Sequence, residues 1–399
     1  MMHRIAFIDT GFTGSLLPLI RQLIKRGWQV DLYEMGSNHI IKEEAFTFEE
    51  IPCHGTIGEV PLDYYKHIEN YLDLSKFRFM YLSVMRPFAS VPLLRNIIHT
   101  LRVRRLKQIA RKLNKENYDM VNLISVYWNK DYIPLIENID GKKIVSIHEV
   151  CNHYSPDFEH TPPFLKKVFK KELPIVVFSD KSRDDILKYK DITPATVHNL
   201  RFGCFETYKY MLRHTSIYTD NNYFLFFGYL KPYKGVDTFA HAIQIIMEKR
   251  NDIKFVIAGK GYDKSLDTIK DNPNVTFINR FLENDELAQL IQKAYAIVCP
   301  HKTTSQSGIP QTCFVFGKPL IASALGCFKE IIGDNLFGLL TEPESAEDLA
   351  DAIIRLWEDK VLYKRLTDNI ANFEQIKKEY CWHEITESYL QLTGTTNNK

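Results

Sequence analysis

The feature that most constrains this chain is a strict alternation of short apolar runs and helical segments in its second half. Strands are expected at residues 223–227, 254–258, 275–278, 296–299 and 319–322, with helices at 236–249, 283–293, 308–316 and 346–358. Such alternation is typical of βαβ units, whose helices cover both faces of a parallel sheet. We therefore expect a doubly wound α/β domain, which binds ligands at the carboxyl ends of its strands.

The first half begins in the same way. Residues 5–8 are apolar, residues 11–15 (GFTGS) read as a turn, residues 16–25 have helical spacing, and residues 30–33 start another strand. Further strands are expected at 120–124, 143–147 and 175–178, and the joint between the halves at about 201–221. The pattern predicts a second Rossmann-like domain.

Charge and cysteine content exclude several protein classes. The net charge of the 399 residues is only +2, so the molecule as a whole is not a polyanion binder, and no nucleic-acid recognition motif is present. The seven cysteines form no C-x-x-C pair, which argues against a zinc knuckle or a disulfide framework. No apolar run is long enough to span a membrane. We expect a cytoplasmic enzyme.

The sequence FGYLKPYKG (residues 227–235) connects an expected strand to an expected helix. Lys231 and Lys234 then lie at the carboxyl end of a strand and beside a helix N-terminus, where cations and unpaired N–H groups would bind a diphosphate. The alternative is a solvated loop with two ordinary surface lysines. The loop by itself does not distinguish these two interpretations.

Three companion motifs follow in order: IAGKG (257–261), NVTFINRF (274–281) and SQSGIPQTCFVFGKPLIAS (305–323). Together with residues 227–235, which we call the lysine loop, they resemble the C-terminal domain of family 4 retaining glycosyltransferases, from about residue 223 to 362. The resemblance implies the α/β GT-B fold, with two Rossmann-like doubly wound domains that face each other across a cleft. It implies an acceptor-binding domain at 1–205 and a nucleotide-sugar-binding domain at 206–370. A C-terminal helix at 371–399 could pack back on the N-terminal domain.

By the same resemblance, Lys234 neutralises the donor diphosphate, and Lys231, Ser307 and Gly308 add contacts to it. A fixed cation there would favour the transition state, because charge grows on the leaving group as the sugar–phosphate bond breaks. His148 matches a histidine beside the donor sugar, although a histidine that caps a strand end is the alternative. The residues expected to contact the nucleotide or sugar are Gly14, Gly228, Gly261, Arg280, Phe281, Thr304 and Thr312.

Two departures from the family stand out. Tyr229 occupies the position of a frequent arginine, whose charge Lys231 could replace without the arginine's fork. Thr304 and Thr312 occupy the positions of two glutamates that usually hold ribose and sugar hydroxyls. The S-Q-S-G form resembles a variant found among polysaccharide-assembly transferases.

These features predict sugar transfer from a nucleotide diphosphate sugar to a glycan or lipid-linked glycan, with retention at the anomeric carbon and in surface polysaccharide biosynthesis. No D-x-D motif occurs, so neither a metal nor another cofactor is expected. Two alternatives stay open. One is a nucleotide-sugar epimerase, for which Glu149 is the motif-adjacent carboxylate, and the other is a non-catalytic GT-B partner subunit.

A basic segment extends over residues 76–115, where no acidic residue occurs. Apolar and aromatic residues alternate with its cations, as in peripheral contacts with an anionic membrane. Such a contact would place the enzyme at the inner face of a membrane, close to a lipid-linked acceptor. The alternative is a core helix with a solvated basic face.

Overall fold

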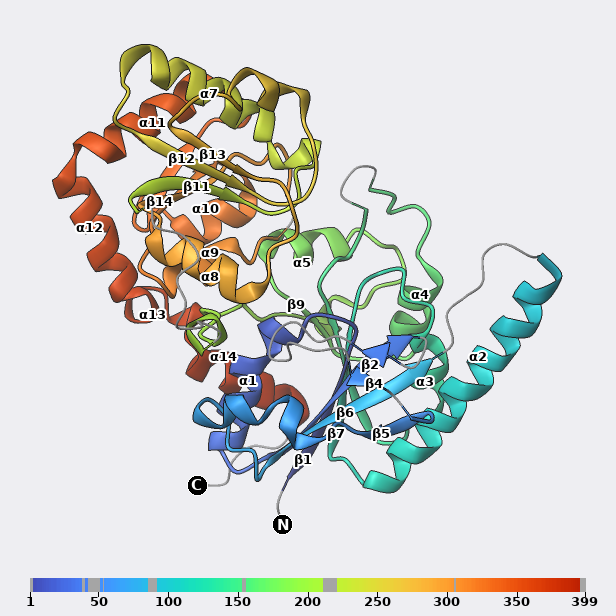
Figure 1. Ribbon diagram of the computed structural model, residues 1–399. Helices are drawn as coiled ribbons and strands as arrows, with labels where there is room; N and C mark the ends of the chain where they lie inside the picture. Colours follow the sequence, from blue (N-terminus) through green and yellow to red (C-terminus); the bar gives the residue numbers. More distant parts are fainter. Residues whose placement is uncertain are drawn as a thin grey trace. The chain divides into compact units, whose positions relative to one another are not determined.

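The computed structural model describes residues 3–37, 40–41, 51–52, 54–84, 92–152, 156–210, 221–304 and 306–394. The chain divides into two compact units. Unit 1 consists of residues 1–202 and 382–399, and unit 2 consists of residues 203–381. Figure 1 shows both units along the chain.

The sheet of unit 1 is mainly parallel. Its strands are β1 (Arg4–Asp9), β2 (Gln29–Ser37), β3 (Ile40–Ile41), β4 (Ile51–Pro52), β5 (Ile57–Glu59), β6 (Phe77–Val84), β7 (Met120–Ser125), β8 (Lys142–Ile147), β9 (Ile175–Val177) and β10 (Val197–Asn199). Their order is β10-β9-β8-β7-β1-β2-β3-β4, and β6 lies beside β2 and β5. Among the described residues, the antiparallel pairs are β2–β3, β3–β4 and β5–β6. The βαβ start predicted from residues 5–33 is confirmed.

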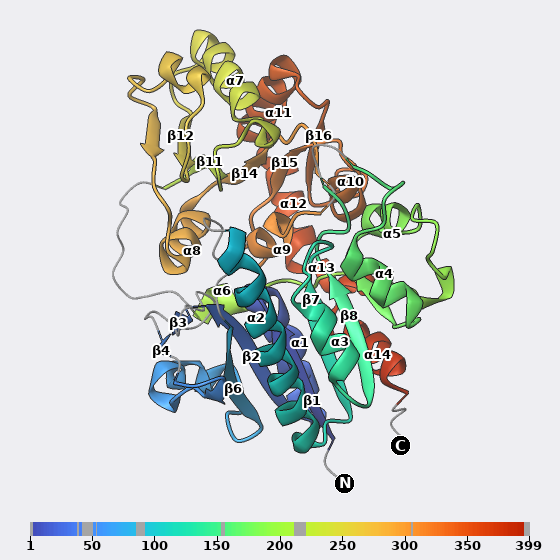
Figure 2. The same cartoon turned by 90° about the vertical axis from the view of Figure 1, so that its right-hand side faces the viewer.

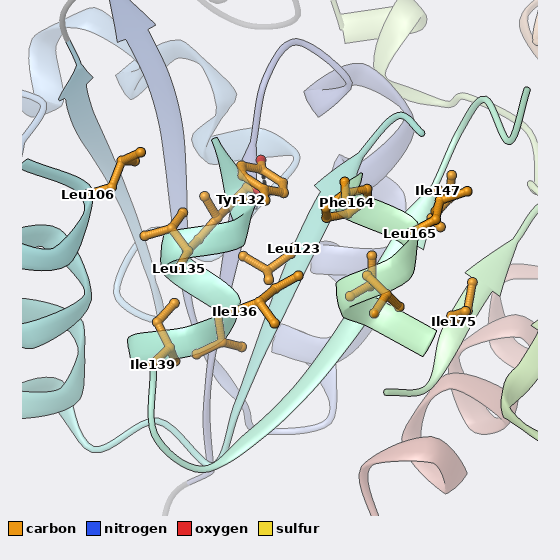
Figure 3. Packing of buried hydrophobic residues seen from close by; sticks show 14 of the residues in the cluster. Leu106, Leu123, Tyr132, Leu135, Ile136, Ile139, Ile147, Phe164, Leu165 and Ile175 are labelled. Atoms are coloured by element: carbon orange, nitrogen blue, oxygen red, sulfur yellow. Dashed lines mark hydrogen bonds between the residues drawn. The ribbon is translucent and has the colours of Figure 1, made fainter. Parts of the chain in front are cut away.

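Helices cover both faces of this sheet. They are α1 (Thr13–Lys25), α2 (Pro92–Leu113), α3 (Tyr132–Asn138), α4 (Pro163–Lys170), α5 (Asp180–Ile186) and α14 (Trp382–Thr393). Alternate residues of β7 separate the two faces: Leu123 packs in the core under α2, α3 and α4, and Asn122 points to the opposite face. Figure 3 shows the apolar side of this arrangement.

The opposite face of the unit 1 sheet carries α1 and α14. Buried Asn122 donates a hydrogen bond of 2.7 Å to the Tyr389 hydroxyl of α14 and accepts one of 3.1 Å from Ser146 of β8. Arg26, at the end of α1, forms an ion pair with Glu387. Helix α14 is therefore an integral part of unit 1, although it follows unit 2 in the sequence.

Unit 2 has a six-stranded, fully parallel sheet. Its strands are β11 (Tyr223–Phe227), β12 (Lys254–Ala258), β13 (Val275–Ile278), β14 (Ala296–Cys299), β15 (Leu320–Ser323) and β16 (Gly338–Thr341), in the order β13-β12-β11-β14-β15-β16. This is the doubly wound Rossmann order, which reverses between β11 and β14. The predicted strands are confirmed to within one residue, and β16 is an addition.

The helices of unit 2 bury both faces of its sheet. They are α6 (Thr207–Tyr210), α7 (Val236–Lys249), α8 (Asn284–Lys293), α9 (Ile309–Phe314), α10 (Gly326–Ile332), α11 (Ala346–Glu358), α12 (Lys360–Ala371) and α13 (Phe373–Ile376). Even-numbered residues of β11 pack with α7 and α11, and odd-numbered ones with α8, α9 and α10. Figure 2 shows these layers from the side. The predicted fold class, two Rossmann-like units, is confirmed.

The basic segment is not one amphipathic element. Residues 77–84 form strand β6, in which Phe77, Phe79 and Leu82 are buried. Arg78 is paired with Asp31 through two hydrogen bonds of 2.8 and 2.5 Å. Residues 85–91, and the side chains of residues 92–95, lie outside the described part of the chain. The alternative, a core helix with a solvated basic face, fits the second half of α2, where Leu106, Ile109 and Leu113 are buried.

Candidate functional site

The connections that follow β11 and β14 touch at the point where the strand order of unit 2 reverses. Gly235, between β11 and α7, has a φ of 68°. A Cβ at this position would lie 1.7 Å from the carbonyl oxygen of Pro300, which directly follows β14. Only glycine allows both the backbone conformation and this close approach. The lysine loop is therefore held against the end of β14, where doubly wound sheets bind their ligands.

Lys234 precedes this glycine, and its amine points to a buried histidine. Its Nζ lies 2.9 Å from Nε2 of His301, which is only 1% exposed. Burial lowers the pKa of Lys234, and burial, followed by the nearby Lys234 charge, lowers the pKa of His301 to about 3. The imidazole is therefore neutral and accepts a hydrogen bond from the amine. Among the described residues, no carboxylate forms an ion pair with Lys234.

Lys231 lies at the surface three residues earlier. It is exposed, and its Nζ lies 5.5 Å above the ring of Tyr229, which is itself 51% exposed. Gly228 has a φ of 120°, and Gly261 forms an isolated parallel bridge with Leu230. The two predicted glycines therefore hold adjacent loops together at the carboxyl ends of β11 and β12.

A pocket of about 160 Å³ lies beside these loops. Gly228, Tyr229, Lys260, Arg280 and Phe281 are among its lining residues. Arg280 is paired with both carboxylate oxygens of Glu286, at 2.6 and 2.7 Å. Its guanidinium therefore anchors the loop to α8, and Phe281 is 43% exposed beside it. This position suits a planar group that lies against an aromatic ring.

The segment between β14 and α9 brings together the remaining predicted residues of unit 2. Thr304 donates its hydroxyl proton to the backbone carbonyl of Gln306 at 2.8 Å, and Thr312 donates to that of Gly308 at 3.0 Å. Ser307 accepts a hydrogen bond of 3.4 Å from the Ile309 N–H. Both threonines thus bond to the backbone of their own segment. Ser305, the first residue of the S-Q-S-G motif, lies outside the described residues.

His148, at the end of β8, lies in an aromatic enclosure in unit 1. Its ring stacks on Phe12 with centroids 3.8 Å apart, and Phe178 and Phe202 lie at 4.8 and 5.5 Å. Burial lowers the pKa of His148 to about 3, so the imidazole is neutral. Nε2 has no hydrogen-bond partner among the described residues. Gly14 is the second residue of α1, close in sequence to Phe12.

Phe12 also lines a pocket of unit 1. This cavity of about 550 Å³ lies at the carboxyl ends of β1, β2, β6 and β7. Its lining includes Thr10, Met35, Val84, Arg102, Trp128 and Lys130. Trp128 is 52% exposed. The pocket therefore combines an accessible aromatic face with Lys130 and with the ion pair of Arg102 and Asp131, which also lines it.

Buried Asp9 supports the loop that carries Phe12. Its carboxylate accepts hydrogen bonds from the backbone of Thr10 and Phe12 and from the hydroxyl of Thr13, at 2.7, 2.9 and 2.7 Å. Burial is nevertheless the larger influence and raises its pKa to about 6.

The structure thus places the predicted residues in two groups. Unit 2 holds Lys231, Lys234, Ser307, Gly308, Thr304, Thr312, Gly228, Gly261, Arg280 and Phe281, and unit 1 holds His148 and Gly14. Sequence reasoning missed His301. Its place directly after Cys299-Pro300, at the end of a strand adjacent to the lysine loop, was the available signal.

Among the described residues, no group of three or more His, Cys, Asp or Glu side chains is arranged to hold a metal ion. No helix in the same residues is both long and apolar enough to cross a membrane.

Comparisons with known proteins find similarity to glycosyltransferases. Residues 221–359 match the family model described as glycosyl transferases group 1. The alpha-D-kanosaminyltransferase of Streptomyces kanamyceticus is 23% identical over 257 residues, which cover 60% of this chain and 65% of that protein. The O-antigen chain mannosyltransferase C of Escherichia coli is 23% identical over 73% of this chain and 78% of its own length.

A solved structure extends the similarity to the whole fold. The Anabaena protein Alr3699/HepE, in complex with UDP-glucose, superposes with a TM-score of 0.64 at 13% identity, over 98% of this chain and 100% of that one. The kanosaminyltransferase match spans less than two thirds of that relative's length. Residues 221–359 are therefore similar to the glycosyl transferases group 1 family, and the chain as a whole has the GT-B fold.

Proposed function

We propose that this protein transfers a sugar from a nucleotide diphosphate sugar to a glycan or lipid-linked glycan, with retention of the anomeric configuration, in the assembly of a surface polysaccharide. The observation that carries the proposal is Lys234. Its partly buried amine lacks a carboxylate partner among the described residues and lies where the strand order reverses, within the region that matches the group 1 family model.

The donor diphosphate is the natural counter-ion for this amine. A partly buried ammonium without a counter-ion is unfavourable, and burial lowers the pKa of Lys234. A bound diphosphate would supply the missing negative charge and return the amine to its charged form. Lys231, Ser307 and Gly308 lie in the loops that follow the same two strands and would add donors to the phosphate oxygens. A nucleotide-sugar donor also agrees with the UDP-glucose complex of the Anabaena protein.

The chemistry of transfer follows from charge development on the leaving group. As the bond between the anomeric carbon and the phosphate oxygen breaks, negative charge grows on the diphosphate, and Lys234 stabilises it. In front-face substitution the departing phosphate accepts the acceptor's hydroxyl proton, so no protein nucleophile is needed and the configuration is retained. His148, neutral and with an unpaired Nε2 among the described residues, would form a hydrogen bond with the donor sugar.

The acceptor would bind in the large pocket of unit 1, within the proposed acceptor domain of residues 1–205. The exposed face of Trp128 suits the apolar face of a sugar ring, and Phe12 separates this pocket from His148. A glycan acceptor agrees with the O-antigen role named for the Escherichia coli relative.

Contact with an anionic membrane would bring the protein to a lipid-linked acceptor at the inner face. The first half of α2 supports this part of the proposal. In Figure 1 it extends away from the sheet that the second half covers, and Ile97 and Leu101 are 55% and 41% exposed. Arg104, Lys107 and Arg111 are exposed on the same helix. Vesicle sedimentation with and without anionic lipid would test it.

A panel of nucleotide sugars with UDP, GDP, dTDP and CMP as the nucleotide tests the donor. We expect one class to raise the melting temperature of the protein and Lys234→Ala to abolish that shift. The control is Lys254→Ala, which removes the same charge from the first residue of β12, at the edge of the sheet opposite to the lysine loop. This variant should leave the shift unchanged. Product release and the NMR coupling constant of the new glycosidic bond then test transfer and retention. No shift with any donor would contradict the proposal.

The bonding of Thr304 and Thr312 to the backbone favours one alternative, a non-catalytic subunit that binds nucleotides. Donor binding by the purified protein without turnover, even with acceptor glycans present, would support that alternative.

A further inference from the structure

Residues 300–302, which directly follow β14, contact residues 233–235 of the lysine loop in reverse order. At one end, the N–H of Lys302 donates a hydrogen bond of 2.8 Å to the carbonyl of Tyr233. At the other end, the carbonyl of Pro300 lies against the glycine that closes the loop, in the space where a side chain would be. The backbone therefore fixes the two segments on both sides of the middle contact.

The middle contact joins two side chains, the amine of Lys234 and the imidazole of His301. Nζ lies 2.9 Å from Nε2 and 5.3 Å above the ring of Tyr233. The ring of Phe328 meets the imidazole at an angle of 76°, with centroids 5.2 Å apart, and the ring of Tyr233 meets it at 72° and 6.3 Å. Because His301 is almost fully buried and packs against both rings, its acceptor nitrogen is held toward the amine.

The carboxylates close to the lysine loop have another partner. Nζ of Lys302 lies 2.6 Å from Asp237, in the first turn of α7, and 3.4 Å from Glu344. The two lysines of these adjoining segments are therefore treated differently. Lys302 is neutralised by carboxylates, whereas the side-chain hydrogen bond of Lys234 within the described ranges goes to an uncharged ring.

We infer that His301 is a positioning residue for the donor diphosphate, an inference that rests on the proposed function. The hydrogen bond to Nε2 directs the Lys234 amine and uses one of its three protons, so two protons remain for phosphate oxygens. A neutral acceptor compensates none of the positive charge of the amine. The diphosphate therefore meets an amine that is held in place and still carries its full charge.

A carboxylate at the same position would hold the amine equally well but would oppose the ligand. It would form an ion pair with Lys234 and repel the phosphate oxygens a few ångströms away. An apolar side chain would leave the amine without direction. His301 should therefore act through its lack of charge as well as through its hydrogen bond, and different substitutions separate these two effects.

The test compares His301→Gln, His301→Glu and His301→Leu with His241→Leu, a control on the exposed side of α7. Glutamine and glutamate have the same shape and differ in charge, and either can bring an oxygen to the place of Nε2. Titration calorimetry would measure the affinity of the full-length protein for UDP, GDP and dTDP. Ligand-observed NMR would measure its affinity for uridine, guanosine and thymidine, which lack the diphosphate and so report on the rest of the site.

We expect His301→Leu to bind the preferred nucleoside diphosphate about tenfold more weakly than the wild type, because a hydrogen bond to a charged group is lost. His301→Gln should bind it within about threefold of the wild type, since a neutral acceptor is restored. His301→Glu should bind it at least about tenfold more weakly than His301→Gln, because of its charge. Nucleoside affinity should be the same in all of these proteins, and His241→Leu should match the wild type throughout.

Equal affinities of the glutamine and glutamate variants for the diphosphate would overturn the inference, and so would a glutamine variant as weak as the leucine variant. A loss of nucleoside affinity as large as the loss of diphosphate affinity would also overturn it, because that is the result of a purely structural role. If Lys234→Ala abolishes diphosphate binding and no His301 variant weakens it, this inference fails and the proposed donor site stands. No binding of any nucleotide or nucleotide sugar to the wild type would contradict the proposed function itself.

Discussion

Replacement of His148 by phenylalanine should make unit 1 less sensitive to acid. Burial lowers the pKa of His148 to about 3, from the ordinary value of 6.5. The unfolded chain takes up a proton as the pH falls below 6.5, and the folded unit does not until about pH 3. The stabilisation is therefore fully present above pH 6.5 and is lost progressively below it. At about pH 5 the wild type should have lost about 2 kcal/mol of unfolding free energy through this residue.

Asp9, beneath the same loop, acts in the opposite direction. Burial raises its pKa to about 6, above the ordinary value of 3.8. Its folded form holds a proton that the unfolded chain releases, so this residue stabilises unit 1 as the pH falls from about 7 to 5, by about 1 kcal/mol. The wild-type profile therefore combines two opposed contributions. The difference between variant and wild type isolates the contribution of His148.

Phenylalanine keeps an aromatic ring against Phe12, so the enclosure stays filled. Urea unfolding of both proteins at about pH 7 and pH 5, followed by fluorescence, gives the two free energies. We expect His148→Phe to lose about 2 kcal/mol less than the wild type over this range. His99→Phe, on the exposed surface of α2, is the control. If the His148 variant loses as much stability as the wild type, the argument that burial holds this imidazole neutral is refuted.

Three further predictions concern the loops and pockets of the two units. Gly235→Ala should destabilise unit 2 by more than about 3 kcal/mol and abolish nucleotide binding, because its Cβ would lie 1.7 Å from the Pro300 oxygen. Gly317→Ala, with a similar φ of 69° but nothing within 4 Å of the added carbon, should cost only about 1 kcal/mol by calorimetry. Trp128→Ala should lower kcat/KM for the acceptor about three- to tenfold without changing donor affinity, and a changed donor affinity would contradict the placement of the acceptor in this pocket. Asp9→Asn should gain about 1 kcal/mol of unfolding free energy relative to the wild type as the pH rises from about 5 to about 7, because only the wild type then loses the proton of Asp9. Urea unfolding at both pH values measures the difference, and no gain would exclude a raised pKa of Asp9.

The architecture of unit 2 could be read from the sequence because each strand is an apolar run bounded by turn residues. In β11 all five residues are apolar or aromatic, as expected for a strand that is covered on both faces. The position of the lysine loop could be predicted for the same reason, because residues that directly follow a predicted strand must lie at the carboxyl end of that strand. Strand β16 was missed because it begins with a glycine and only two of its residues, Leu339 and Leu340, are apolar.

Strand β6 shows where prediction from local sequence patterns fails. Arg78 made this segment look like part of a basic surface, but its guanidinium is matched by Asp31, almost fifty positions away in the sequence. No local pattern contains that partner. The same limit applies to His301, whose importance lies in its contact with Lys234.

The attachment of α14 to the sheet of unit 1 has a consequence for how this chain is made. A ribosome would release all the residues of unit 2 before it releases Tyr389, whose hydroxyl meets Asn122 in the first unit. Unit 2 is continuous in sequence and can complete its core during synthesis. Unit 1, although translated first, must wait with one face of its sheet covered only in part, by α1, until the final helix emerges. A nascent chain of this protein should therefore acquire protease resistance in its second unit earlier than in its first.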